Sequence, residues 1–115
     1  HSCEMARGSG VTLALFGERL PALPRAPELA KMGFVPSGAY RNLEFVRQRV
    51  RFDPSLPRCR QDLLCDPQTS GGLLIALEEG RARELLDRLG ESGHEAAVVG
   101  SVQKRGDWDV TVSFS

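Results

Sequence analysis

The run Leu73–Leu77 limits the choice of fold more than any other stretch, because five consecutive apolar residues follow a polar loop that ends in two glycines. A run of this length is typical of a β-strand that is buried on both faces. Before it, Asp66-Pro67 predicts a turn, since proline fixes its own φ and moves the preceding residue out of the helical region. Gly71-Gly72 allows a positive φ or a close backbone approach. We therefore expect a buried strand over 73–77.

The loop between this turn and the strand permits two interpretations. Gln68, Thr69 and Ser70 carry short hydrogen-bonding side chains. These can cap backbone groups at a tight entry into the strand, or they can present donors, together with backbone N–H groups, to a phosphate or to another domain. Neither a Walker lysine nor a G-x-G-x-x-G spacing accompanies the loop, so no nucleotide motif supports the second interpretation.

Length and charge narrow the class of protein. A chain of 115 residues is one domain or part of one, and its 41% apolar and 26% charged residues are ordinary for a globular protein. Fifteen basic and fifteen acidic residues cancel. We therefore expect no nucleic-acid partner and no membrane association, and no apolar run reaches the length of a membrane span or of a signal peptide.

The cysteines and histidines indicate neither a disulfide framework nor a zinc site. The three cysteines, Cys3, Cys59 and Cys65, are odd in number and irregularly spaced, which favours a reducing compartment and hence the cytoplasm. No C-x-x-C occurs, and His1 and His94 are far apart. Cys65 stands in an apolar setting, so we interpret it as a buried, inert thiol rather than a reactive one.

Local patterns predict an alternation of helices and strands. In the first half we expect a helix over 1–7 that ends at the glycines of 8–10, a strand over 11–16, a proline-rich connector over 20–27, a short helix over 28–32 and a helix over 37–46. A turn-rich loop over 52–57 and a short helix over 58–64 should lead to the strand over 73–77. After it we expect a helix that starts at 78 and ends at Gly90 or Gly93, then strands over 96–102 and 108–114 joined by a hairpin turn at 105–107. A helix that begins at residue 1 indicates that the chain is cut from a longer protein.

The helix over 37–46 has Ser37 as its predicted N-cap and an apolar face that Asn42 interrupts. Asn42 either bridges backbone groups or makes a polar contact at a cleft. We interpret the neighbouring basic run as a solvated face rather than an anion site; it comprises Arg41, Arg47, Arg49 and Arg51.

Three stretches of the chain resemble the selenophosphate synthetases, also called selenide, water dikinases. Leu64-Cys65-Asp66-Pro67-Gln68-Thr69-Ser70-Gly71-Gly72-Leu73-Leu74 is similar to a signature near the C-terminal end of that family. Residues 34–46 carry a similar Pro-x-Gly-x-x-x-Asn pattern. Residues 1–10 are similar to the end of a helix that in the family follows an aspartate-containing Gly-Phe-Gly motif, although Cys3 stands where leucine is common.

The resemblance implies an α/β (α+β) fold of the aminoimidazole ribonucleotide synthetase superfamily, with helices packed on a mixed sheet. Residues 1–115 would be a single domain, the C-terminal one, truncated at its N-terminal edge. The family makes selenophosphate, AMP and phosphate from selenide, ATP and water, with Mg²⁺. Its nucleophilic Cys or Sec, its catalytic lysine and its metal-binding aspartates lie upstream, so the resemblance implies no catalytic or metal-binding residue in this chain.

The implied partners and site follow from this placement. The expected partners are the N-terminal domain of the same protein, a second copy in a homodimer, and selenide as the substrate of the whole enzyme. ATP and Mg²⁺ would bind the whole enzyme and not this chain alone, which should be inactive. The residues expected to face the interdomain cleft or the nucleotide are Asp66, Gln68, Thr69, Ser70, Gly71, Gly72 and Asn42. Two other functions stay open, namely a small ligand-binding or regulatory module and a purely structural packing or dimerisation domain.

Overall fold

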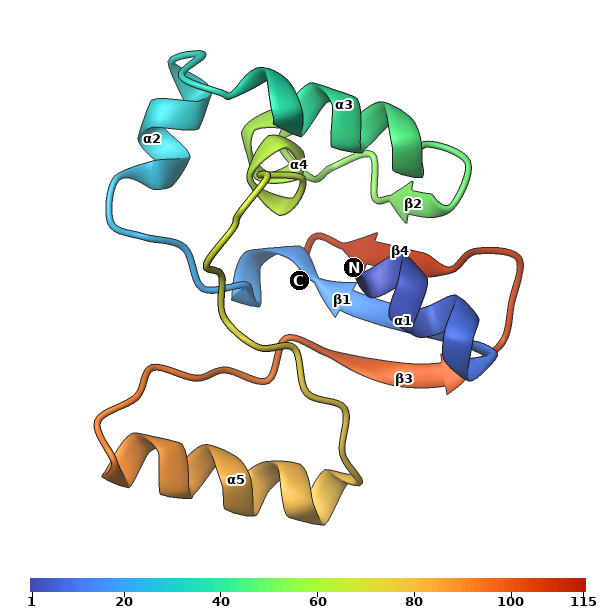
Figure 1. The fold of residues 1–115 in the computed structure, drawn as a ribbon, viewed down its shortest axis with the longest axis vertical. Helices are drawn as coiled ribbons and strands as arrows, with labels where there is room; N and C mark the ends of the chain where they lie inside the picture. The colour runs from blue at the N-terminus through green and yellow to red at the C-terminus, as the bar shows by residue number, and fades with distance from the viewer.

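The computed structural model describes residues 1–115 and contains one mixed sheet of four strands (Figure 1). In chain order the strands are β1 (Val11–Phe16), β2 (Val50–Phe52), β3 (Gly100–Lys104) and β4 (Val110–Ser113). Their order across the sheet is β2-β4-β1-β3. Strand β4 runs parallel to both β1 and β2, whereas β3 runs antiparallel to β1. With the helices described next, this confirms the expected α/β fold.

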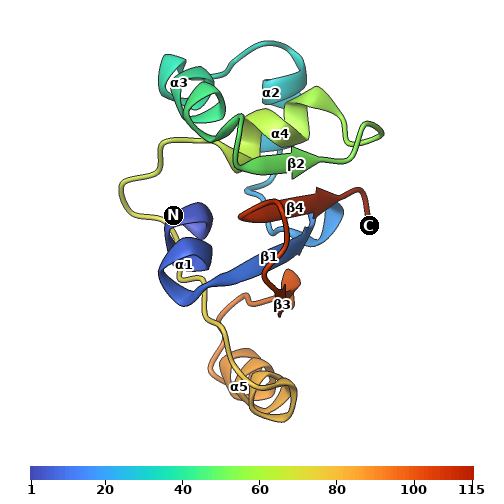
Figure 2. The ribbon, with the colours of Figure 1, turned by 90° about the vertical axis from the view of Figure 1, so that its right-hand side faces the viewer.

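Five α-helices and one 3-10 turn accompany the sheet: α1 (Ser2–Ser9), η1 (Gly17–Arg19), α2 (Ala26–Lys31), α3 (Ser37–Val46), α4 (Arg58–Leu64) and α5 (Glu79–Glu91). Helix α1 packs on β1 and β4, and α2 and α3 both pack on α4 beyond the β2 edge of the sheet (Figures 1 and 2). The five predicted helices are confirmed, with small shifts at their ends. Ser37 is the first residue of α3 and not its cap, because Pro36 holds the cap position. No helix combines the length and the apolar character that crossing a bilayer needs.

A small core joins α1 to the two central strands. Its six buried side chains are those of Cys3, Ala6, Leu13, Leu56, Val110 and Val112. Val110 and Val112 are buried while Thr111 between them is half-buried, which is the alternation predicted for a strand with one covered face. Gly10 ends α1 in the left-handed region at φ 64° and turns the chain into β1.

The predicted hairpin between the last two strands is wrong, because β1 lies between β3 and β4. The connection instead passes across the start of β1, where the buried hydroxyl of Thr12 holds it. Thr12 Oγ1 donates to the carbonyl of Trp108 at 2.7 Å and accepts from the N–H of Gly106 at 3.0 Å. Beside it, Arg105 pairs with the buried carboxylate of Asp109 at 2.6 Å. These side-chain bonds fix a crossover where the turn residues alone predicted a hairpin.

The predicted buried strand over 73–77 is also wrong. Residues 71–78 have no regular structure, and Leu73 is 89% exposed. No backbone hydrogen bond joins residues 69–77 to another element. A β-strand needs a neighbouring strand to bond with, and this apolar run has none. We call residues 69–99 the arm. It leaves α4, passes through α5 and returns to β3, and α5 stands apart from the sheet (Figures 1 and 2).

The return of the arm corrects one further boundary. The strand predicted over 96–102 begins only at Gly100. Before Gly100, the N–H of Phe16 in β1 donates a backbone hydrogen bond to the carbonyl of Val99 at 2.8 Å. The apolar face predicted for α5 is present but none of its residues is buried; the half-buried ones are Ala82, Leu85, Leu86 and Leu89. The arm therefore presents its apolar residues to solvent.

Candidate functional site

One side-chain hydrogen bond joins α3 to the chain that leaves α4. The Nδ2 of Asn42, in the middle of α3, donates to the backbone carbonyl of Cys65 at 2.9 Å. Cys65 caps the C-terminus of α4, where helical carbonyls have no partner within the helix. The amide therefore satisfies an oxygen that α4 leaves open. This confirms Asn42 as a backbone bridge, while its contact with a ligand stays a prediction.

A second contact between the same segments involves Gly38, in the first turn of α3. A Cβ placed on Gly38 would lie 2.6 Å from Cγ and 3.1 Å from Cβ of Pro67. Such distances are shorter than real side-chain contacts, so only glycine lets α3 approach the proline this closely. The pattern Pro-x-Gly-x-x-x-Asn therefore touches the chain at two points where the Asp66–Gly72 loop begins, at Cys65 just before it and at Pro67 within it, although the two stretches are distant in sequence. Figure 2 shows α3 and α4 side by side at this end of the molecule.

Beyond Pro67 the predicted site residues leave this junction. Asp66 is half-buried beside it, whereas residues 68–72 are exposed. Neither Gly71 nor Gly72 has a positive φ, so the left-handed backbone that these glycines allow is not used. A Cβ at Gly71 would meet only the flexible Gln68 side chain, and one at Gly72 would meet nothing. The structure thus joins Asn42 to Cys65, the neighbour of Asp66 in the chain, and leaves the rest of the loop open.

Sequence reasoning missed the polar contacts that support this junction from α4. The carboxylate of Asp62 is buried and accepts from Nε of Arg58 at 2.8 Å, and this hydrogen bond raises the pKa of the arginine. The guanidinium of Arg58 also lies 6.0 Å from the centre of the Tyr40 ring of α3. Opposite charges four residues apart in a helix were the available signal. Arg58 therefore links both helices of the junction.

Three of the four arginines of the basic run are exposed, as predicted for a solvated face, whereas Arg49 is half-buried. Arg41 donates to the hydroxyl of Ser37 at 3.3 Å, and Arg47 pairs with Glu44 at 3.6 Å, with both members of that pair well exposed. Exposed pairs of this kind contribute about 0–1 kcal/mol each. The charges of Arg41 and Arg47 are therefore met by solvent and by neighbouring side chains.

The cysteine next to the loop is not set up as a nucleophile. Burial, and after it the neighbouring Asp62 carboxylate, raise the pKa of the Cys65 thiol from its ordinary 9.0 to about 11. Burial also raises the pKa of Cys3. Thiolates rather than thiols attack substrates, so both groups are inert near neutral pH. This confirms the predicted buried, inert thiol at Cys65.

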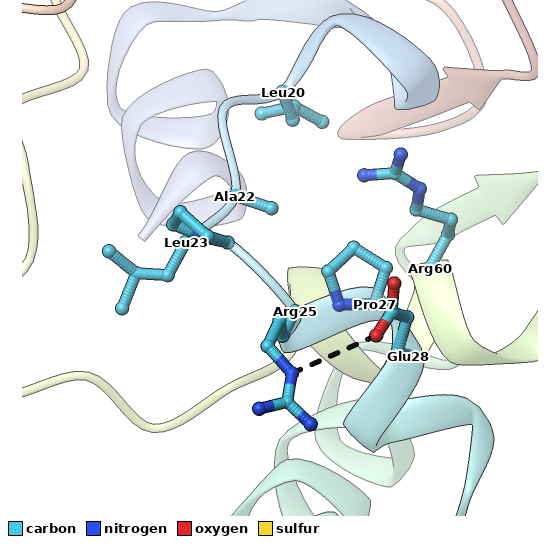
Figure 3. A pocket seen from close by; sticks show the side chains of 8 residues that line it. Leu20, Ala22, Leu23, Arg25, Pro27, Glu28 and Arg60 are labelled. Carbon is cyan, nitrogen blue, oxygen red and sulfur yellow. Dashed lines mark ion pairs between the residues drawn. The ribbon is translucent and has the colours of Figure 1, made fainter.

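A pocket of about 310 Å³ lies away from the loop, between the proline-rich connector and α4 (Figure 3). Its two guanidiniums are already paired, because Arg60 meets Glu18 at 3.4 Å and Arg25 meets Glu28 at 3.9 Å. The pocket therefore offers no free charge to an anion. In the whole chain, no three His, Cys, Asp or Glu side chains gather closely enough to hold a metal ion.

Comparison with known proteins accounts for nearly the whole chain. The model of the AIR synthase related protein, C-terminal domain, matches residues 1–113. Selenide, water dikinase of Clostridium botulinum (strain Eklund 17B / Type B) is 39% identical over 112 residues, which are 97% of this chain and 32% of that protein. Selenide, water dikinase 2 of Peptoclostridium acidaminophilum is 42% identical over 113 residues, again 97% and 32%. The enzyme of Geobacter sp. (strain M21) is 45% identical over 109 residues, which are 92% and 30%.

The chain therefore spans about a third of the length of the curated relatives it matches. The family model covers all but the last two residues, and the mixed sheet with its packed helices agrees with the α/β architecture expected from the resemblance. The chain belongs to the family of AIR synthase related proteins, as a C-terminal domain of that family.

Proposed function

We propose that residues 1–115 form the C-terminal domain of a selenide, water dikinase and supply one wall of the cleft between its two domains. The observation that carries this proposal is the junction of α3 with the Asp66–Gly72 loop. Two separate stretches that resemble the selenophosphate synthetases meet there, through the Asn42 hydrogen bond and the Gly38–Pro67 contact. Relatives named for that activity support the same assignment.

In this proposal the enzyme converts selenide, ATP and water into selenophosphate, AMP and phosphate. Phosphoryl transfer depends on neutralising and positioning the phosphates, a task usually shared by Mg²⁺ and donor groups. This chain does not fit a metal, because no cluster of acidic or nitrogen ligands is present. Its contribution is the set of donors on Gln68, Thr69 and Ser70, which stand free in the open loop. ATP and Mg²⁺ would then bind mainly to the other domain.

The proposed partners are the N-terminal domain of the same protein and a second copy in a homodimer, in the cytoplasm. The exposed apolar residues of the arm support a covering partner, since contiguous apolar patches on a monomer mark interaction surfaces. The same residues favour one alternative function, a purely structural packing or dimerisation domain. The two functions differ in whether the open loop affects turnover.

The activity itself is tested by AMP release from ATP in the presence of selenide. The intact protein that carries this chain should release AMP, whereas residues 1–115 alone should not, because they contain neither a metal site nor an activated nucleophile. Release of AMP above the blank by the purified 115-residue chain would overturn the assignment of its role. Absence of AMP release by the intact protein would overturn the proposed reaction.

The role of the loop is tested by Gln68→Ala and Thr69→Ala. Both side chains are exposed, so each change should shift the free energy of unfolding by no more than about 0.5 kcal/mol. If the side chains contact the reacting ligand, each change should lower kcat/KM of the intact protein by about ten-fold or more. Gln48→Ala, at an equally exposed glutamine outside the loop, is the control and should leave turnover unchanged. Full activity with a lowered melting temperature would instead identify the loop as a structural turn.

A further inference from the structure

We propose that Asn42 and Gly38 are positioning residues, which hold the start of the Asp66–Gly72 loop against α3 and so determine where its donors stand. The proposal rests on the function proposed above and adds how that site is built. It concerns two residues that act through the loop backbone and not by touching the ligand.

The first argument is that the Asp66–Gly72 loop is hydrogen-bonded to the rest of the chain only at its start. Backbone hydrogen bonds anchor only its start, from the N–H of Asp66 to Leu63 at 3.2 Å and from the N–H of Gln68 to the carbonyl of Asp66 at 2.9 Å. Residues 69–77 make no further backbone hydrogen bond to any element. The direction in which the loop leaves α4 is therefore decided near Cys65 and Pro67, which are the two residues that α3 contacts.

The second argument is the chemistry of Asn42. The side-chain amide reaches the Cys65 carbonyl as a donor, at 2.9 Å. A carboxylate of the same shape can only accept, so it would face the carbonyl with two acceptors and no hydrogen bond. The bond spans 23 positions of the chain and joins α3 to the residue that caps α4. Asn42 therefore fixes the distance between α3 and the start of the loop.

The third argument is the steric match at Gly38. Glycine 38 is buried and its φ is not positive, so its backbone conformation does not require glycine. The requirement comes from Pro67 alone, whose ring lies where a Cβ would stand. An added methyl group must push Pro67 away, and the loop moves with it. A displacement of about 1 Å at a reacting group can cost about 100-fold in rate.

The experiment compares Asn42→Asp with Gln48→Glu in the intact protein. Both changes replace an amide by a carboxylate on or next to α3, but only the first removes a hydrogen bond. Two readouts are measured for each variant. They are kcat and KM for AMP release, and the hydrogen exchange of the Asp66 and Gln68 amides, the two hydrogen-bonded amides of the loop, at saturating ATP and without ATP. We expect Asn42→Asp to lower kcat by about ten-fold or more at an unchanged content of folded protein, with faster exchange in the loop, while Gln48→Glu behaves as wild type.

Gly38→Ala supplies an independent test through double substitution. Alone it should lower kcat, and combined with Pro67→Ala, which removes the ring that the new methyl group meets, it should recover part of the loss. Loss of stability without recovery by the second change would overturn the steric argument. Unchanged kcat and unchanged loop exchange in Asn42→Asp would overturn the positioning role.

The two proposals fail differently. If the wild-type protein releases no AMP, the proposed reaction is wrong, and the exchange measurement still decides whether Asn42 holds the loop. If the wild-type protein is active and Asn42→Asp loses only melting temperature, the reaction stands and Asn42 is a purely structural residue.

Discussion

At the scale of single residues, the fold changes the chemistry of the thiol at position 65 more than that of any neighbouring group. Cys65 is buried next to Asp62, and both burial and this carboxylate oppose the thiolate, raising the pKa to about 11. The unfolded chain releases the same proton near the ordinary value of 9.0. Because the native state keeps a proton that the unfolded state has lost, stability falls as pH rises between these two values.

The prediction is a loss of stability in alkaline solution that depends on this thiol. The contribution of Cys65 should be complete below about pH 9 and should disappear as pH rises through about 11. Urea unfolding at a series of pH values measures it, with Cys65→Ala as the comparison, because alanine cannot titrate. A flatter pH dependence is expected in the variant, although the Cys3 thiol remains and also resists ionisation. Equal slopes in both proteins would contradict the prediction.

Residue-scale chemistry was only partly readable from the sequence. The inert thiol was predicted from its apolar setting and is confirmed, and of the two roles left open for Asn42 the structure shows the backbone bridge. The partner of Asn42 is 23 residues away, and no local pattern identifies it. The glycine that matters for packing near the site is Gly38 rather than Gly72, because the requirement arises from a proline that only the fold brings close.

At the scale of elements, helices were predicted better than strand pairing. Helices α1, α3 and α4 follow from the 3.6-residue pattern and from end signals such as Gly10, which are local in sequence. Strand β2 was missed because Val50–Phe52 is too short to show an alternation. The order β2-β4-β1-β3 depends on bonds such as that of Thr12 to Trp108, between residues 96 positions apart.

The pairing of β1 with β3 predicts a strong effect at Gly100. A Cβ there would lie 2.2 Å from the carbonyl oxygen of Ala14 and 3.0 Å from the Cα of Leu15, both of which are backbone atoms in β1. Gly100→Ala must therefore push the two strands apart, and we expect a loss of about 2 kcal/mol in the free energy of unfolding. Urea denaturation measures it. Gly80→Ala, in open space in the first turn of α5, is the matched control and should be neutral or stabilise by up to about 1 kcal/mol.

At the scale of the whole molecule, the surface is larger than a folded monomer of this mass requires. The accessible surface is 8416 Å², whereas a compact monomer of 12.6 kDa has about 6,200 Å². The excess lies with the arm, whose helix has no buried residue and whose apolar run is open to solvent. The sequence identified this apolar run but wrongly predicted its burial in a strand. Whether such a run is buried depends on a partner strand or surface and not on local pattern.

The open arm predicts that the 115-residue chain associates with itself when it is alone. Leu73 and Ile75 are 89% and 51% exposed, and we call the exposed apolar run over 73–77 that contains them the apolar edge. Removing such an edge from water is favourable at about 25 cal/mol per Å², and a second copy is the partner always available in a pure sample. Multi-angle light scattering should therefore show dimers or larger species that grow with concentration.

Charge placed on that edge should reverse the association. The double change Leu73→Lys with Ile75→Lys should shift the population toward monomer and leave the helical circular dichroism unchanged, because neither residue belongs to a helix or to the core. Leu23→Lys is the matched control, since Leu23 is 80% exposed but lies in the proline-rich connector outside the arm, and it should associate as the parent chain does. A monomer at all concentrations in the parent chain would contradict the prediction. Equal association of the double variant would show that another surface joins the copies.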